Sequence, residues 1–512
     1  MNPADQSDVI QFLEKPESYG CRTGGVERID THSAVVFLVG DRAYKLKRAV
    51  KYSYLDNSTV ERRRRHCEAE LTLNRRTAPE LYLSVQPITR DASGRLRIGG
   101  EGEAVDWLVV MRRFDQEALL DRMAARGAVD RALILALTDR IVAFHKEAEA
   151  VPSFGGAANA AAVLRGDIEN LRRGVPRPFD RNAVERLAAG SEAALARIGG
   201  VLDRRRDMSR VRRCHGDLHL RNICLFEGRP TLFDCIEFND AIACIDVLYD
   251  LAFLLMDLDH RGLRPLANAV FNRYFDLSAE EEGDLVVLPQ FLSQRAAIRA
   301  HVAVAAAAAQ VDPARAESEF EAARDYLAMA LDYLRPVRPR LIAIGGLSGT
   351  GKSTLAYGLA PAIGMAPGAR VLRSDVIRKR LAGVAPEARL PEEAYRPEMA
   401  ERVYETLAEM AGAALAGGHT VIADAVFSKP EERDAIAAVA RAAGVPFDGL
   451  WLKAPAEVLE ARVAARRGDA SDATVEVLRR QLDYDLGPIE WPRIDVSGDP
   501  SACLAAARSV LD

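Results

Sequence analysis

Residues 341–353 read Leu-Ile-Ala-Ile-Gly-Gly-Leu-Ser-Gly-Thr-Gly-Lys-Ser, an apolar stretch that runs straight into a glycine-rich loop. From Gly346 the loop fits the pattern G-x-x-x-x-G-K-[ST], and the residues after it favour a helix. Glycines let backbone N–H groups turn inward around phosphate oxygens, and a helix N-terminus adds partial positive charge. The sequence therefore predicts a nucleotide phosphate site made by Gly346, Ser348, Gly349, Thr350, Gly351, Lys352, Ser353 and Thr354.

Two side chains of this loop have separate expected roles. Lys352 is expected to reach the β- and γ-phosphates, and the Ser353 hydroxyl to help hold Mg²⁺. The nucleotide is ATP or GTP, because the motif does not distinguish the two bases.

Strands and helices alternate from this loop to the end of the chain. The expected strands are 341–345, 370–374, 420–424, 448–452 and 493–497, and their alternation with helices predicts a parallel sheet flanked by helices. Asp375 follows the second strand, where a carboxylate can accept the proton of an attacking hydroxyl. Asp424 ends the third strand and is a candidate for the Mg²⁺ shell. The alternative for both residues is a helix N-cap.

Arginines occur on and after a helix near residue 462, ahead of a glycine-containing loop. Arg462 and Arg466 are candidates for a flap that stabilises charge on the transferring phosphoryl group, although a solvated helix face would also explain them. Residues 340–512 resemble the small P-loop kinases, such as gluconate kinase, chloramphenicol phosphotransferase and the kinase part of polynucleotide kinase. The resemblance implies phosphate transfer from a nucleotide and leaves the acceptor open.

The segment Leu334-Arg-Pro-Val-Arg-Pro-Arg340 divides the chain, because its two prolines stop the preceding helical pattern. We expect one domain over residues 1–335 and a second over 336–512. In the first, Val35 to Lys47 alternate around a Gly-Asp turn and predict a β-hairpin. Mostly helical patterns follow from about residue 115, so an antiparallel sheet lobe followed by a helical lobe is expected.

Residues 214–223, Cys-His-Gly-Asp-Leu-His-Leu-Arg-Asn-Ile, match the kinase pattern H-x-D-L-x-x-x-N. In this pattern Asp217 would orient and deprotonate the acceptor hydroxyl, and Asn222 would bind Mg²⁺. Residues 223–233 predict a short hairpin with a Glu-Gly turn. Such a hairpin returns the chain beside its start, so that Asp234 can share a metal ion with Asn222.

Lys45 and Lys47 lie on the second strand of the opening hairpin and point to the same face. Either can contact the nucleotide phosphates, and Glu70, on the following predicted helix, can orient the lysine that does so. Exposed lysines on a strand are usually solvated, and only the loop at 214–223 favours the nucleotide role here.

Residues 30–300 resemble the aminoglycoside phosphotransferase family, with its choline-kinase and fructosamine-kinase relatives. The likeness lies in the lysine strand, Glu70, His215-Gly-Asp217, Asn222 and Asp234. The whole chain resembles bacterial proteins that fuse such a domain to a P-loop kinase domain. The resemblance implies a protein-kinase-like bilobal fold of the α+β class, followed by an α/β P-loop fold. It does not imply antibiotic resistance.

Composition excludes several classes of protein. The 512 residues carry a net charge of -5, which argues against a protein that coats nucleic acid. The one basic run, Arg62 to Arg65, lies among glutamates that can pair with it on a solvated helix face. No apolar stretch is long enough to span a membrane and no export signal is present, so the cytoplasm is expected. Seven cysteines without a CxxC pair are expected to be small buried residues.

These features together predict an ATP- and Mg²⁺-dependent phosphotransferase with two kinase-type centres that act on a hydroxyl of a small polar metabolite, of the sugar or aminocyclitol class. Two alternatives remain. The P-loop domain can be a nucleotide-binding regulatory module, or the acceptor can be a polynucleotide or a protein. The oligomeric state is not predicted.

Overall fold

The computed structural model describes residues 6–20, 25–52, 54–465 and 470–511, and the chain forms two compact units. The first unit comprises residues 1–159 and 203–257, and the second comprises 160–202 and 258–512. The helices between 258 and 333 thus belong to the same unit as the parallel sheet. The domain boundary at residue 335 rests on the two prolines of the 334–340 segment and stays a prediction.

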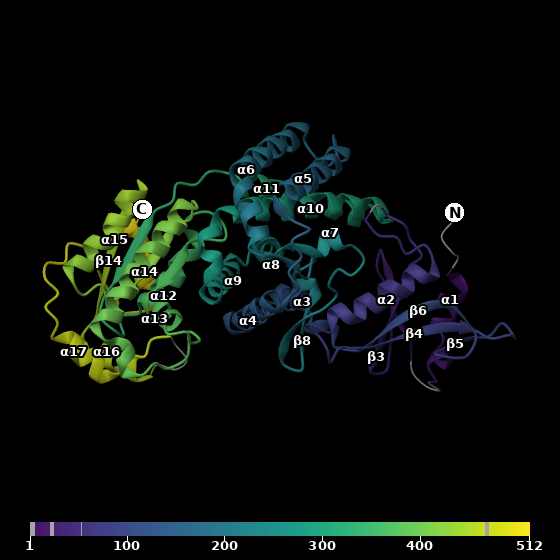
Figure 1. Cartoon of the computed structure of the whole chain (residues 1–512), viewed down its shortest axis with the longest axis horizontal. Helices are drawn as coiled ribbons and strands as arrows, with labels where there is room; N and C mark the ends of the chain where they lie inside the picture. The colour runs from purple at the N-terminus through teal and green to yellow at the C-terminus, as the bar shows by residue number, and fades with distance from the viewer. Residues whose placement is uncertain (1–5, 21–24, 53, 466–469, 512) are drawn as a thin grey trace. The chain divides into compact units, whose positions relative to one another are not determined.

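A six-stranded antiparallel sheet forms the first half of the first unit (Figure 1). The strand order is β1-β2-β3-β6-β4-β5. The elements of this half are α1 (Ser7–Leu13), β1 (Glu27–Asp30), β2 (Ala34–Val39), β3 (Arg42–Lys47), α2 (Val60–Asn74), β4 (Tyr82–Arg90), β5 (Leu96–Ile98) and β6 (Glu103–Arg112).

The predicted hairpin is β2 and β3, which turn at Gly40 and Asp41. Apolar residues from both faces of the sheet are buried, because α2 and α1 contribute Cys67 and Leu13 to clusters on opposite faces. Lys45 and Lys47 share a face with Ala43, which belongs to the cluster on the α2 side. The alternation of β3 therefore points both lysines at α2.

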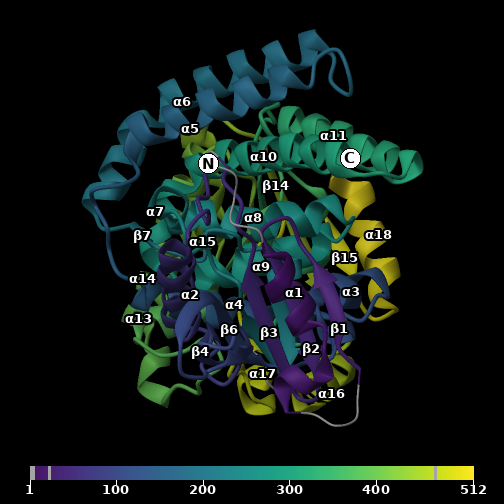
Figure 2. The ribbon, with the colours of Figure 1, turned by 90° about the vertical axis from the view of Figure 1, so that its right-hand side faces the viewer.

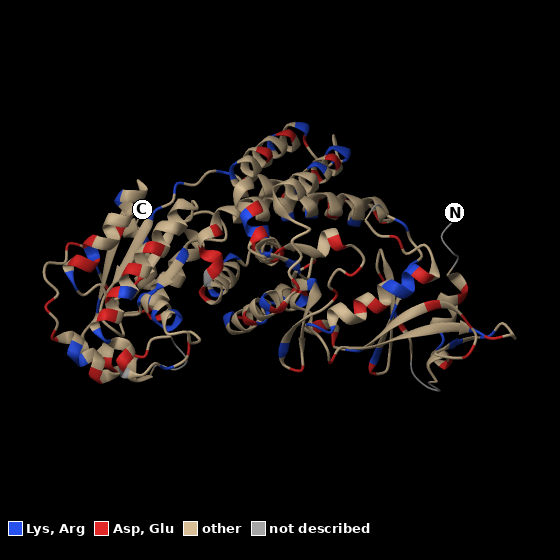
Figure 3. Ribbon diagram, viewed as in Figure 1, with Lys and Arg blue, Asp and Glu red and all other residues tan. Residues whose placement is uncertain are grey.

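The basic run on α2 differs from the solvated face that the sequence predicts. Arg64 forms the expected i,i+4 pair with Glu68 at 2.9 Å. Arg63, however, is 1% exposed and binds Asp106 of β6 through two nitrogens at 2.8 and 3.0 Å. Helical periodicity turns this one arginine toward the sheet. In Figure 3 basic (blue) and acidic (red) positions are interspersed along most helices, and blue positions are prominent on α2.

The second half of the first unit is mostly helical with two small antiparallel pairs. Its elements are α3 (Leu120–Ala125), α4 (Arg131–Glu147), β7 (Val211–Arg213), β8 (Ile223–Phe226), β9 (Arg229–Leu232), α7 (Asp240–Ala243), β10 (Cys244–Asp246) and α8 (Val247–His260). The β8–β9 hairpin and its Glu227-Gly228 turn confirm the prediction. The β7–β10 pair was not predicted, because three residues per strand are too few to show a period of two.

Long helices open the second unit. They are α5 (Gly156–Arg173), α6 (Arg181–Asp207), α9 (Arg264–Leu277), α10 (Leu288–Ala309) and α11 (Pro313–Tyr333). Between α10 and α11, Asp312 accepts a hydrogen bond from the Ala314 N–H, and Pro313 occupies the first turn of α11. Figure 2 shows α10 and α11 lying side by side.

The rest of the second unit is a five-stranded parallel sheet in the order β12-β13-β11-β14-β15. The strands are β11 (Leu341–Gly345), β12 (Arg370–Arg373), β13 (Val421–Asp424), β14 (Phe447–Lys453) and β15 (Arg493–Asp495). The helices are α12 (Lys352–Leu359), α13 (Ser374–Leu381), α14 (Pro397–Ala416), α15 (Pro430–Ala443), α16 (Ala456–Ala465), α17 (Val475–Leu482) and α18 (Pro500–Leu511). All five strands were predicted, and the phosphate loop follows the central one.

The edge strand β12 is closed by α9 rather than by another strand. The Val371 N–H donates to Asn272 Oδ1 at 2.7 Å, and Asn268 Nδ2 donates to the Ala369 carbonyl at 3.1 Å. The fully buried Arg370 binds Glu282 through two nitrogens and Asp276 through a third contact at 2.8 Å. Since buried backbone groups and charges must be paired, α9 completes this sheet.

Two expectations from composition can be checked. The six cysteines that the structure describes are all buried and free, which confirms their reading as small buried residues. In the described part of the chain, no helix is both long and apolar enough to cross a bilayer.

Candidate active sites

The loop between β7 and β8 brings Asp217 and Asn222 into contact. Asn222 Nδ2 donates to Asp217 Oδ2 at 2.8 Å and to the Asp217 carbonyl at 3.0 Å. His219 Nε2 lies 3.2 Å from the same carboxylate oxygen. The Asp217 side chain is 36% exposed, so an acceptor hydroxyl can approach it.

Buried carboxylates of α8 hold this loop by accepting hydrogen bonds from its backbone N–H groups. Asp250 of α8 accepts the backbone N–H groups of His215 and Gly216 at 3.0 and 2.9 Å. Asp257 accepts the Leu220 N–H at 2.9 Å. His215 is itself buried and lies with Nε2 2.9 Å from the Phe233 carbonyl, and burial lowers its pKa. Asp250 therefore anchors the loop, and His215 packs against it.

The β8–β9 hairpin returns the chain to Asn222, as its length predicts. The Phe233 N–H donates to the Asn222 carbonyl at 3.0 Å, which places Asp234 next to the loop. Asp234 adopts a φ of 60°, a conformation that non-glycine residues rarely take, and its N–H donates to the Tyr82 hydroxyl at 3.1 Å. That strained conformation is typical of residues placed for function.

Lys45 and Lys47 are bridged by Glu70. Glu70 Oε1 lies 2.8 Å from Lys45 Nζ, and Oε2 lies 2.5 Å from Lys47 Nζ. Burial alone would raise the pKa of Glu70, but the two lysines lower it to about 2. The carboxylate therefore stays ionised and holds both ammonium groups.

Each lysine also binds a second carboxylate. Lys45 Nζ lies 2.5 Å from Asp234 Oδ1, and Lys47 Nζ lies 2.5 Å from Glu237 Oε1. Of the two lysines, only Lys45 touches a predicted metal ligand. The sequence left open which of the two lysines contacts the nucleotide phosphates. The geometry favours Lys45.

The donor set of this first centre fits Mg²⁺, which prefers carboxylate and amide oxygens. Asp234 offers a 42% exposed carboxylate, and Asn222 turns its amide nitrogen toward Asp217. These two residues would hold the ion, which would neutralise charge on the nucleotide phosphates. Lys45 would turn from Asp234 to those phosphates.

The phosphate loop of the second centre has the backbone that its glycines predict. Gly346 and Gly349 have φ values of 140° and 84°, and a Cβ on either would lie less than 3 Å from a backbone carbonyl oxygen. Lys352 Nζ donates to the Gly346 and Leu347 carbonyls at 2.8 and 3.1 Å. Thr350 donates to the Leu347 carbonyl, and the Thr354 side chain is exposed on α12.

Ser353 and Asp424 meet at the carboxyl ends of β11 and β13. Ser353 Oγ donates to Asp424 Oδ2 at 2.5 Å, and Arg373 Nε lies 3.5 Å from the same oxygen. Burial raises the pKa of Asp424, while Arg373 and Lys352 lower it and nearby Asp375 raises it. A hydroxyl and a carboxylate fit a Mg²⁺ shell. Asp424 is no helix cap, because α15 begins only at Pro430.

Asp375 lies in the first turn of α13 and is half-buried. The N-cap of this helix is Arg373, so Asp375 does not occupy the capping position that was the alternative. Arg462 donates from Nη2 to the Val496 carbonyl at 2.8 Å. Arg466 lies outside the described residues, so both arginines keep a predicted role only.

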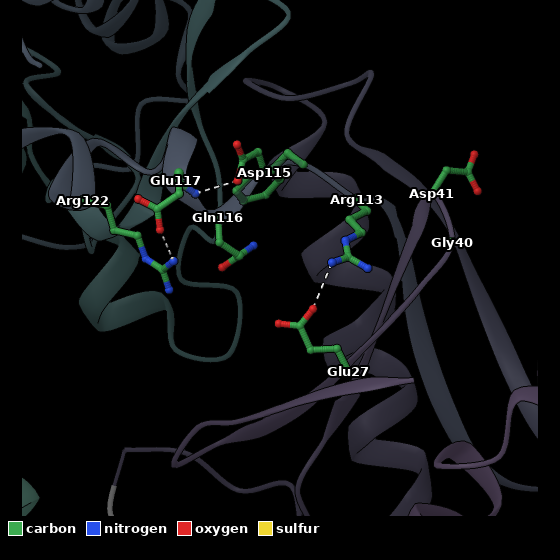
Figure 4. Close-up of a pocket in the computed structure, with 9 residues that line it drawn as sticks. Glu27, Gly40, Asp41, Arg113, Asp115, Gln116, Glu117 and Arg122 are labelled. Atoms are coloured by element: carbon green, nitrogen blue, oxygen red, sulfur yellow. Dashed lines mark hydrogen bonds and ion pairs between the residues drawn. The ribbon is translucent and has the colours of Figure 1, made fainter. Parts of the chain in front are cut away.

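A hollow of about 370 Å³ opens at the end of the first sheet, but it contains no predicted site residue. Figure 4 shows its charged walls, with Glu27 2.9 Å from Arg113 and Glu117 2.8 Å from Arg122. Its other lining residues are Gly40, Asp41, Phe114, Asp115 and Gln116. The candidate chemistry is carried by other residues.

Comparison with known families covers both parts of the chain. A family model described as the phosphotransferase enzyme family matches residues 32–285, and one described as an AAA domain matches residues 341–485. Proteins of Mycobacterium tuberculosis and Mycobacterium bovis, both described as uncharacterized, are 32% identical over 496 residues. The match covers 92% of this chain and 92% of each relative.

The chain belongs to the same family as these mycobacterial proteins. It is a fusion of an aminoglycoside-phosphotransferase-like domain with a P-loop kinase domain, and hence a phosphotransferase of the kinase type. The resemblance that the sequence suggested is confirmed.

Two of the solved structures that are similar to parts of this chain are described as kinases or kinase family proteins. A choline/ethanolamine kinase family protein from Mesorhizobium loti covers 64% of this chain and is itself covered to 99%, at 14% identity and a TM-score of 0.39. A sugar kinase from Janibacter covers 34% and is covered to 95%, at 27% identity and a TM-score of 0.25. Such low TM-scores carry no conclusion about the acceptor.

Three polar contacts at the candidate sites of the fused kinase were not predicted from its sequence. Glu237 binds Lys47, Arg373 approaches Asp424, and the Gln481 side chain accepts the Ser348 N–H at 2.8 Å. Glu237 follows Asp234 by three residues, and that proximity was the one available signal. Gln481 of α17 contacts the phosphate loop although it lies 133 residues from Ser348 in the sequence, and no local sequence pattern predicts such a contact.

Proposed function

We propose that the chain is a Mg²⁺-dependent phosphotransferase with two kinase-type centres that uses ATP or GTP. Each centre moves the γ-phosphate to a hydroxyl of a small polar metabolite, of the sugar or aminocyclitol class. The acceptor oxygen forms the new P–O bond, the bond between the γ-phosphorus and the bridging oxygen breaks, and the nucleoside diphosphate leaves. We place this activity in the cytoplasm.

In the first centre Asp217 takes the proton of the acceptor hydroxyl. Asn222 and Asp234 hold Mg²⁺, and Lys45 grips the phosphates while Glu70 orients it. The contact between Asn222 and Asp217 carries this proposal, because it keeps the candidate base 2.8 Å from a candidate metal ligand. A base beside a metal ligand can act on the acceptor hydroxyl while the metal acts on the phosphates of the same transfer.

In the second centre the loop from Gly346 to Ser353 binds the nucleotide, Ser353 and Asp424 hold the metal, and Asp375 takes the acceptor proton. The strand register supports this assignment, because Arg373 of β12 pairs with Asp424 of β13 and Asp375 follows Arg373 by two residues. Arg462 and Arg466 belong to this proposal as phosphate-charge stabilisers.

The acceptor is proposed to be small because three of the four arginines in the basic run on α2 form ion pairs within the protein. Arg63 binds Asp106, Arg64 binds Glu68, and Arg62 binds Asp56. A polynucleotide acceptor needs basic side chains that are available to phosphates.

The test is a polar metabolite extract incubated with the protein, Mg²⁺ and ATP labelled in its γ-phosphate, followed by untargeted mass spectrometry. Asp217→Asn and Lys352→Ala are run singly and together, with the exposed Arg315→Ala of α11 as a control. Two labelled small molecules, each lost in one variant, support the proposal.

Other outcomes contradict parts of it. Label on RNA or on protein overturns the small acceptor. The P-loop domain is a regulatory module if a single product forms with the following behaviour. Asp217→Asn abolishes the product, Lys352→Ala changes its rate of formation, and Asp375→Asn has no effect.

A further inference from the structure

Five side chains of the first centre form an unbroken row of alternating charge. In order they are Asp234, Lys45, Glu70, Lys47 and Glu237, and the four contacts between neighbours measure 2.5, 2.8, 2.5 and 2.5 Å. We call this set the charge row. Three carboxylates and two ammonium groups give it a formal charge of one negative unit.

The charge row is open at one end and closed at the other. Asp234 is 42% exposed and Lys45 is 15% exposed, whereas Glu70, Lys47 and Glu237 are 0%, 5% and 6% exposed. The open end consists of the two residues proposed to bind metal and phosphate. At the closed end Lys47 and Glu237 form a buried ion pair, which is costly to form, and Glu70 links this pair to Lys45.

The open end must change partners when Mg²⁺ and nucleotide bind, a step that rests on the proposed function. Lys45 and Asp234 now satisfy each other, so Lys45 moves to phosphate as Asp234 moves to metal. Glu70 then shares Lys45 with the phosphates while remaining fully buried. A buried carboxylate that loses its cation is strongly unfavourable, and Lys47 is the second cation on Glu70.

The closed end also controls the position of Asp234. Glu237 lies three residues beyond Asp234 in the same segment, and its bond to Lys47 ties that segment to β3. Burial raises the pKa of Glu237, and Lys47 offsets this only in part. The ion pair with Lys47 thus compensates for the burial of the Glu237 carboxylate.

We propose that Lys47 and Glu237 are positioning residues of the first centre, which hold Glu70 and the 234–237 segment in place while Lys45 and Asp234 engage the Mg²⁺–nucleotide complex. Neither residue touches the nucleotide. Their removal weakens the binding of Mg²⁺–nucleotide and leaves the acceptor site unchanged.

The test measures binding rather than turnover. A non-hydrolysable ATP analogue is titrated calorimetrically into the full chain at a series of Mg²⁺ concentrations, in a Lys352→Ala background that silences the second centre. The main variant is Lys47→Met with Glu237→Leu, which keeps the charge of the row at one negative unit and so avoids an unpaired buried charge. Lys47→Arg serves as the conservative variant.

The matched control is Arg63→Met with Asp106→Leu. It also removes a buried ion pair between α2 and the sheet, 1% exposed on both sides, but not one of the charge row. We expect the main variant to keep its melting temperature within the range of the control and to need about 10- to 100-fold more Mg²⁺ for half-saturation. Lys47→Arg recovers part of this loss.

Binding by the main variant within twofold of the parent overturns the proposal, and so does an equal loss in the control. The outcome is separable from the proposed function. If the parent binds Mg²⁺–nucleotide but transfers no phosphate to any acceptor, the proposed function fails while the binding comparison still decides the role of Lys47 and Glu237.

Discussion

Ser353 at the start of α12 donates its hydroxyl hydrogen to Asp424 at the end of β13, and the two oxygens lie 2.5 Å apart. The residues are 71 positions apart in sequence, and the pairing of β11 with β13 brings them together. Both were predicted separately as metal ligands, and their contact makes one metal site the natural assignment.

On acidification, the second centre should lose its metal ion at a higher pH than a site held by an aspartate of ordinary pKa. Burial raises the Asp424 pKa above its ordinary 3.8, and the carboxylate must be ionised to bind Mg²⁺. As the pH falls toward that raised pKa, the Mg²⁺ concentration for half-saturation should rise in an Asp234→Asn background, which removes a proposed metal ligand of the first centre. Asp424→Asn should remove both the affinity and its pH dependence. An unchanged pH profile in Asp424→Asn would show that another group controls the metal.

Asp217→Asn should abolish transfer at the first centre without abolishing nucleotide binding. Loss of a general base costs about 10²- to 10⁴-fold in rate, whereas Asn still accepts a hydrogen bond from Asn222 and disturbs the metal shell little. Product formation and analogue binding are measured on the same preparation. Equal losses in rate and in binding would instead assign Asp217 to the metal.

Glu70 should give the first unit an acid-sensitive stability. Its pKa is lowered from 4.5 to about 2, so its contribution to folding is fully present above pH 4.5 and is lost as the pH falls toward 2. Urea unfolding between pH 5 and 2 should show a steeper loss for the parent than for Glu70→Gln, which starts lower at neutral pH because both lysines lose their shared partner. Parallel curves would contradict the bridging role.

Arg370→Met should destabilise the second unit by about 3 to 5 kcal/mol, because it leaves Glu282 and Asp276 buried without a cation. Burial already raises the Asp276 pKa, and the loss of Arg370 raises it further. Replacing all three residues with Met and Leu should restore most of the stability. The exposed pair Arg479–Glu460 is the control, where Arg479→Met should cost less than about 1 kcal/mol. Denaturant unfolding checks all three variants.

Local patterns in the sequence were sufficient for the elements that carry the candidate sites. The strand before Gly346, the hairpin around Gly40 and the hairpin that presents Asp234 were all predicted, because each is defined by alternation and a turn within a dozen residues. The weaker elements were not: β7 and β10 pair over 31 residues with three residues each, and nothing local distinguishes them from loop.

The candidate sites show the same division. The sequence placed Lys45, Lys47 and Glu70 in one site but left the two lysines equivalent, since alternation points both to the same face. Only the packing of α2 on the sheet, with the 234–237 segment beside it, distinguished Lys45 from Lys47. The association of α9 with β12 could not be predicted from the sequence either, because Asn272 and Arg370 belong to segments with no shared pattern.

The amino-acid sequence by itself determined that this protein has two phosphate-handling motifs, on a kinase-like loop and on a P-loop, because such motifs are short and their spacing is set by local backbone geometry. The tertiary structure alone decided which charges pair, which carboxylates are buried, and which helices complete the parallel sheet. Those features depend on contacts between residues far apart in the chain, where burial and the pairing of charge, rather than local propensity, set the energy.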